Sequence, residues 1–361
     1  MPRRPPLAPE QLGQALDRTW QAALAERQAG LPALPAPARV PVGSADWQGE
    51  PAQLLPGKLV RPHGIVRYPK APGRHPLVLL LHGNHGTCRA AEGPDTCSLD
   101  PQAACPDDQQ RVDTPSGLVW VADELAARGW IAEVVDVTAA VCTPGHKAVM
   151  ARSDQALAHL RLWQAWQRGT SPPIPADIVA AADLQQVALV GHSTGGDAAL
   201  QTGAKLAHPA AIGLDSVRLR ALLLIAPPDG TRGPVPGVDL GIVLPTCDFD
   251  VSPLEGRHLL DRADSTQPGS RLALWLLGGG SHNAFNQSWR DETVDIGQQN
   301  CDPDYRLPAE TQRAVLGRLT ADWLEAARTG AAVPPWLMGQ GQLPVAAPVD
   351  LRAVVLPAGR R

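Results

Sequence analysis

From about Leu54 onward, short runs of consecutive apolar residues alternate with longer stretches in which apolar residues recur every three or four positions. Continuous apolar runs of this length are typical of strands that are buried on both faces, and the longer spacing is typical of amphipathic helices. The predicted strands are residues 65–68, 77–81, 131–137, 187–190, 221–225, 241–244 and 272–277. The first of them is expected to run antiparallel to its neighbours.

Helical patterns lie between these strands, with apolar faces in residues 118–125 and 157–163 and in a last helix that opens at Pro308. Alternation of strand and helix with short connections predicts an α/β fold. We expect a mainly parallel, open twisted sheet with helices on both faces. Residues 54–330 are predicted to form this single main domain.

Two flanking segments have different patterns. Leu12, Leu16, Trp20 and Leu24 recur every fourth residue, which predicts an amphipathic helix that packs on the main domain, followed by a proline-rich connector. Residues 1–53 are therefore interpreted as an appendage. Residues 331–361 form a proline-rich tail for which the sequence predicts no function.

Composition narrows the classes of partner. The 361 residues include 32 basic and 36 acidic side chains, a formal charge of −4, so no nucleic-acid partner is expected. No apolar run approaches the roughly 20 residues that a membrane-spanning helix needs, so no membrane span is predicted. The positively charged first residues are followed by no apolar leader segment. The sequence leaves the oligomeric state open.

The sharpest motif is Gly-His-Ser-Thr-Gly at residues 191–195, which follows a buried strand and leads into a helical stretch. In a sharp strand-to-helix turn of this kind the serine hydroxyl is exposed, and the flanking glycines avoid a Cβ clash. The pentapeptide alone is a weak signal, and its place between strand and helix makes it strong. Ser193 is therefore the candidate nucleophile.

A serine nucleophile needs an imidazole base and a carboxylate that orients the imidazole, here in the chain order serine, acid, histidine. His282 follows the last predicted strand in a glycine-rich segment and is the candidate base. Asp248 and Asp250 both follow the preceding strand. We prefer Asp250 because it lies deeper in the turn, before a helix expected to begin near Pro253, and Asp248 remains the alternate.

Acyl transfer also requires backbone N–H donors around the developing oxyanion. One donor is expected from Thr194, the residue after the nucleophile. The second should come from the segment after the strand at 77–81, with Asn84 preferred and His85 as the alternate.

Together these motifs resemble the α/β-hydrolase superfamily over roughly residues 54–328, and most closely the lidless bacterial esterases around dienelactone hydrolase, chlorophyllase and the cutinase-like polyester hydrolases. The resemblance implies hydrolysis of a small or polymeric carboxylic ester, such as a polyester, through an acyl-enzyme, without metal or cofactor. An acyltransferase or a cofactor-free perhydrolase on the same scaffold is the alternative, followed by a non-catalytic binding module.

Two departures from the family pattern stand out. A long cysteine-containing insert occupies residues 84–116, where it could roof the site, and the short segment 227–240 leaves no room for a helical cap. Both features predict a site that is open apart from the insert.

The six cysteines lie mostly in glycine- and proline-rich loops, which favours disulfides and an oxidising compartment. Because no leader segment is visible, localisation stays open. We hypothesise a Cys247–Cys301 bridge that ties the acid loop to the histidine loop, with the remaining cysteines paired around the insert. A zinc site that uses these cysteines is the competing interpretation, although no Cys-x-x-Cys pair is present.

Overall fold

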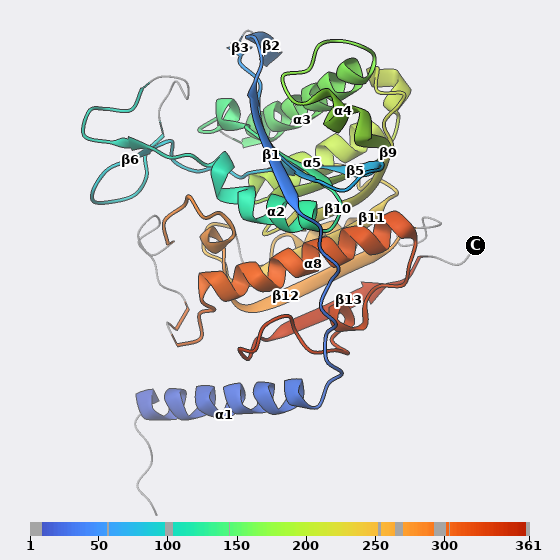
Figure 1. Cartoon of the computed structure of the whole chain (residues 1–361). Helices are drawn as coiled ribbons and strands as arrows, with labels where there is room; N and C mark the ends of the chain where they lie inside the picture. The colour runs from blue at the N-terminus through green and yellow to red at the C-terminus, as the bar shows by residue number, and fades with distance from the viewer. Residues whose placement is uncertain are drawn as a thin grey trace, which may run out of the picture.

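A computed structural model describes residues 9–55, 58–97, 104–143, 145–251, 254–263, 270–291, 301–302 and 304–358, with side chains for all of these except residues 9–18 and 58. Its centre is a nine-stranded sheet in the order β1-β4-β8-β5-β9-β10-β11-β12-β13 (Figure 1). These strands are β1 (Val42–Gln48), β4 (His63–Pro69), β5 (His75–Leu81), β8 (Ile131–Val135), β9 (Ala182–His192), β10 (Leu219–Ile225), β11 (Asp239–Cys247), β12 (Leu272–Ser281) and β13 (Leu351–Leu356).

The six strands from β8 to β12 in this order are mutually parallel, whereas β1, β4 and β13 pair antiparallel with their neighbours. All seven predicted strands are present, and the antiparallel direction of the first is confirmed. The mainly parallel sheet predicted from the sequence is therefore confirmed.

Helices cover both faces of the sheet, as expected. One face carries α3 (Gly145–Gln167), α4 (Ala176–Ala181), α5 (Thr194–Leu206) and α6 (Arg257–Arg262), and the other carries α2 (Val119–Ala127) and α8 (Ala309–Thr329). The side chains of β5 alternate between the two cores, with Leu77, Leu79 and Leu81 in one and Val78 and Leu80 in the other. Burial on both faces explains why this strand is a continuous apolar run.

The chain changes direction in the sheet between β5 and β9. It passes from β5 to β8 on one side, then returns to β9 on the other and continues outward to β12. In open α/β sheets, ligands bind at the carboxyl ends of the strands on either side of such a switch point. The topology therefore predicts a ligand site at the turns after β5 and β9.

The flanking segments pack together. Helix α1 (Pro9–Ala29) buries Leu24, and the guanidinium of Arg352 on β13 lies 5.6 Å from the centre of the Trp20 ring. The side chain of Gln28 accepts a hydrogen bond from the Leu343 N–H at 3.0 Å. The sequence predicted that this helix packs on the main domain, whereas these contacts of its described side chains are with the segment interpreted as a tail.

Shorter elements decorate the sheet. Two ribbons are formed by β2 (Ala52–Leu55) with β3 (Lys58–Val60) and by β6 (Cys88–Arg89) with β7 (Gln110–Arg111). Single turns of 3-10 helix are η1 (Pro115–Leu118), η2 (Thr138–Ala140), η3 (Pro209–Ile212), η4 (Asn283–Phe285) and η5 (Pro335–Met338). No helix lies in the segment 226–238 between β10 and β11, as the sequence predicted. None of the described helices is long and apolar enough to cross a bilayer.

Candidate active site

Ser193 occupies a sharp turn between the end of β9 at His192 and the start of α5 at Thr194. Its φ of +55° lies in the region that residues with a Cβ rarely adopt, and its N–H donates to the Ile225 carbonyl at 2.9 Å. A Cβ at Gly191 would come within 2.2 Å of the Gly195 carbonyl oxygen, so a larger residue cannot replace this glycine without moving the turn. The strand-turn-helix context predicted for the motif is present.

His282 lies at the carboxyl end of β12, with its side chain fully buried. The predicted glycine-rich loop is instead the last part of the strand, because Gly278 to Gly280 continue β12. A Cβ at Gly279 would come within 2.1 Å of the Tyr305 carbonyl oxygen, which explains why the strand needs a glycine there. The histidine is thus presented at the same edge of the sheet as Ser193.

Two carboxylates contact the His282 ring. Asp248 Oδ2 accepts a hydrogen bond from Nδ1 at 2.9 Å and is almost completely buried. Asp250 Oδ2 lies 3.3 Å from Nε2, and its side chain is 44 % exposed. Because Asp248 also accepts the N–H groups of Asp250 and Val251 at 3.1 and 2.9 Å, its carboxylate is held in place from the turn that follows it.

These contacts correct the preference for Asp250. The acid that orients the imidazole has to bond Nδ1, and Asp248, the alternate, holds that position. The sequence placed the end of the strand at residue 244, but β11 continues to Cys247, so Asp248 is the first residue beyond the strand. Pro253, near which a helix was expected, lies outside the described residues, and α6 begins at Arg257.

Aromatic rings surround His282. The Trp289 ring is nearly parallel to it with a centroid separation of 6.2 Å, and the His192 ring is 4.7 Å away. Burial and the neighbouring His282 lower the pKa of His192 well below its ordinary value, so His192 is neutral. Trp289 and His192 were not singled out from the sequence, because only the folded turn brings them to the imidazole.

The segment after β5 lies against Ser193, as predicted. A Cβ at Gly83 would be 2.6 Å from Ser193 Cβ and 3.0 Å from the Trp289 ring. Asn84 is half-buried, and its Oδ1 accepts hydrogen bonds from the Cys142 N–H and from Arg152. His85 stacks on Trp289 with a centroid separation of 4.6 Å. The Asn84 side-chain oxygen and the His85 ring are thus both in contact with neighbouring residues.

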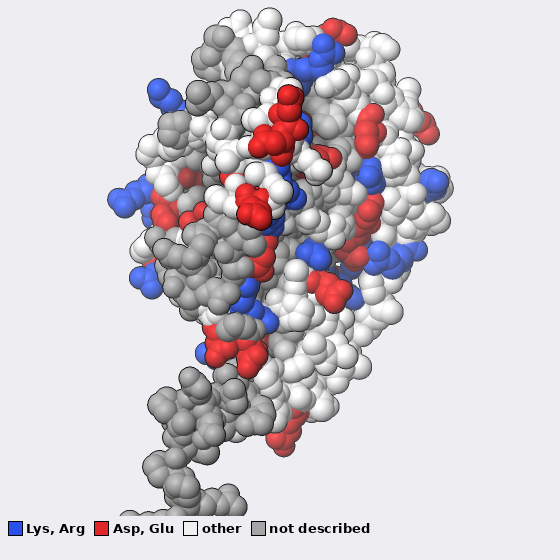
Figure 2. All heavy atoms as spheres, turned by 90° about the vertical axis from the view of Figure 1, so that its left-hand side faces the viewer, with Lys and Arg blue, Asp and Glu red and all other residues white. Residues whose placement is uncertain are grey.

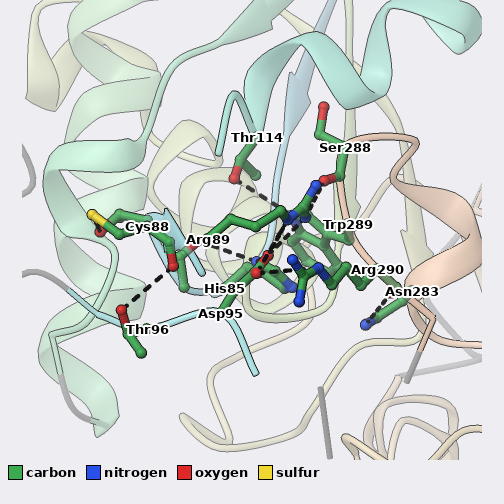
Figure 3. A network of polar contacts seen from close by, with 12 residues as sticks. His85, Cys88, Arg89, Asp95, Thr96, Thr114, Asn283, Ser288, Trp289 and Arg290 are labelled. Carbon is green, nitrogen blue, oxygen red and sulfur yellow. Dashed lines mark hydrogen bonds and ion pairs between the residues drawn. The ribbon is translucent and has the colours of Figure 1, made fainter. Parts of the chain in front are cut away.

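The cysteine-containing insert is attached to the histidine segment by an ion cluster (Figure 3). The Asp95 carboxylate, whose side chain is 1 % exposed, accepts hydrogen bonds from Arg89, and Arg290 lies 3.6 Å away. Arg89 also donates to the Ser288 carbonyl at 2.8 Å, and Arg290 donates to the Gly93 carbonyl at 2.7 Å. These bonds hold the insert over the segment that carries Trp289.

All six cysteines form disulfides, namely Cys88–Cys105, Cys97–Cys142 and Cys247–Cys301. The hypothesised Cys247–Cys301 bridge is confirmed, and the other four pair around the insert as expected. Because no thiolate is left, the zinc site that uses these cysteines is excluded.

On the face that carries the insert, the described acidic and basic side chains are interspersed (Figure 2). Neither a family model nor a curated protein matches this sequence.

Proposed function

We propose that this protein is a serine hydrolase of the α/β-hydrolase superfamily that cleaves carboxylic esters through an acyl-enzyme. The observation that carries the proposal is that Ser193, on a strained turn between β9 and α5, and the buried His282–Asp248 hydrogen bond lie at the same edge of the sheet. Strained backbone at a turn of this kind is a feature of functional sites.

The order of the residues along the fold supports the same proposal. Ser193 follows β9, Asp248 follows β11 and His282 follows β12, which is the order of a hydrolase triad on an open α/β sheet. The turns after β5 and β9 flank the topological switch point, where such sheets bind their ligands.

In the proposed reaction, His282 Nε2 removes the Ser193 proton while the serine oxygen attacks the ester carbonyl. Asp248 holds the proton on Nδ1 and stabilises the imidazolium that forms. The N–H of Thr194 and a backbone N–H of the segment after β5 stabilise the tetrahedral oxyanion. His282 then protonates the departing alcohol, and a water molecule, activated in the same way, releases the acid and regenerates Ser193.

Hydrolysis of p-nitrophenyl esters of graded chain length tests this function. Removal of a triad nucleophile costs on the order of 10⁶-fold in kcat, so Ser193→Ala should reduce turnover to the limit of detection. Ser171→Ala, in an exposed loop, is the matched control and should keep wild-type activity. A folded Ser193→Ala protein that hydrolyses the esters as fast as the wild type would contradict the proposal.

A further inference from the structure

Arg152 on α3 is a buried cation for which the described residues offer no carboxylate partner. Its exposed fraction is 0 %, and no described acidic side chain lies within ion-pair distance of its guanidinium. Burial lowers its pKa to about 9, which leaves the group charged at neutral pH. Burial of a charge without a counter-ion is costly, so the guanidinium must be compensated by the polar groups it contacts.

Those groups are oxygens from the turns that build the site. Nη1 donates to the Ala140 and Ala148 carbonyls, both at 3.1 Å. Nη2 donates to the Gly83 carbonyl at 3.3 Å and to Asn84 Oδ1 at 3.2 Å. One guanidinium therefore connects the segments that follow β5 and β8 with the first turns of α3.

The Gly83 carbonyl is held from two sides. Besides Arg152, the His82 Nδ1–H donates to it at 3.0 Å, while His82 Nε2 accepts the Val137 N–H at 3.1 Å. In a trans peptide the carbonyl and the N–H of the next residue point in opposite directions. Fixing the Gly83 oxygen toward Arg152 thus turns the Asn84 N–H away from α3, on a segment that already lies against Ser193.

We propose that Arg152 is a positioning residue of the oxyanion hole, which fixes and polarises the Gly83–Asn84 peptide so that the Asn84 N–H points at the oxyanion formed on Ser193. The inference rests on the proposed function and adds to it the group that orients the second donor. A cation at a carbonyl oxygen also strengthens the N–H of the same peptide unit as a donor.

Steady-state kinetics of Arg152→Gln and Arg152→Lys, with a p-nitrophenyl ester, test the role. Loss of one oxyanion donor costs about 100- to 1000-fold in kcat. We expect kcat of Arg152→Gln to fall by about 100-fold with KM within threefold of wild type. The kcat of Arg152→Lys should also fall, because a lysine cannot bond all four oxygens at once. The decrease should be smaller than for Arg152→Gln, because the lysine keeps the charge.

A trifluoromethyl ketone inhibitor separates positioning from simple stability. It forms a tetrahedral adduct with the serine, so its inhibition constant should rise by the same factor as kcat falls. Arg128→Gln is the matched control, because Arg128 is also largely buried but donates to Asp322 on α8. It should lower the melting temperature and leave both kinetic values unchanged.

Each outcome decides the question. If both folded Arg152 variants keep kcat within threefold, or lose kcat while the inhibition constant stays constant, Arg152 has no positioning role. If Arg152→Gln does not fold, the lysine variant alone decides by the same comparison. A wild-type protein that neither turns over nor binds the ketone would overturn the proposed function itself, and the role of Arg152 with it.

Discussion

Two aspartates that lie two positions apart in the chain contact opposite nitrogens of the His282 imidazole. Asp248 is buried on Nδ1, and Asp250 is partly exposed beside Nε2. Only the Nδ1 partner can hold the tautomer in which Nε2 accepts the serine proton. The two carboxylates therefore have different surroundings although they come from one turn, and the proposed mechanism uses only Asp248 to orient the imidazole.

Replacement of each aspartate by asparagine tests this division. Asp248→Asn keeps the shape of the side chain but not its charge, and loss of the orienting acid in such a triad lowers kcat by about 10,000-fold. Asp250→Asn should change kcat by less than tenfold, because no step of the mechanism assigns it a proton. The measurement is kcat for one p-nitrophenyl ester at neutral pH. A larger loss for Asp250→Asn than for Asp248→Asn would reverse the assignment.

At the scale of single residues, the sequence predicts those site residues that are marked by their immediate neighbours in the chain. Ser193 and His282 could be found because a glycine-flanked turn and a strand end are visible in a few consecutive residues. The choice between Asp248 and Asp250 depended on the last three residues of β11, which apolar periodicity could not define. Arg152 gave no local signal, because it reaches the site from a helix that is distant in the chain, and Trp289, although close to His282 in the chain, belongs to no recognisable motif.

At the scale of elements, a polar pair connects β4 to the turn after β8. His63 Nδ1 lies 3.1 Å from Asp136 Oδ2, and Asp136 Oδ1 accepts the Thr138 N–H at 2.9 Å. The hydrogen bond with Asp136 raises the pKa of His63 above 6.5. Although burial opposes it, the hydrogen bond from His63 lowers the pKa of Asp136 well below its ordinary value.

These pKa shifts define the pH range in which the His63–Asp136 pair stabilises the fold. A raised histidine pKa stabilises the fold fully below about pH 6.5 and loses this effect as pH rises through the folded value. A lowered aspartate pKa stabilises the fold above about pH 4 and loses this effect only in stronger acid. The pair should therefore contribute most between about pH 4 and 6.5.

His63→Gln is expected to lower the melting temperature most near pH 5.5 and least near pH 9, as measured by thermal unfolding across this range. His208→Gln, at an exposed position after α5, is the control and should show no such trend. An equal loss at both pH values would mean that the pair is not ionised in the folded protein.

Edge strands were the elements that the sequence did not predict. Along β1 and β13, buried or half-buried positions alternate with exposed ones, in contrast to the continuous burial of β5. Alternation is weak in such short segments, and both strands lie in stretches rich in proline, so they were interpreted as connector and tail. Central strands were predictable because burial on both faces requires apolar residues throughout.

At the scale of the whole molecule, the fold brings four segments to one edge of the sheet. The turn after β9 supplies Ser193, the ends of β11 and β12 supply Asp248 and His282, and the insert after β5 is attached to the histidine segment through Asp95. The α/β architecture followed from the alternation of elements. The seating of the insert did not, because it depends on disulfide connectivity and on one buried ion cluster.

The most direct test of a Ser193 nucleophile is intact mass after treatment with a fluorophosphonate, with peptide mapping of the adduct. A serine activated by His282 should react once per chain, at the peptide that contains Ser193, and Ser193→Ala should gain no mass. Ser171→Ala should be labelled as fully as the wild type. A wild-type chain that stays unmodified, or an adduct that maps to another residue, would contradict the account.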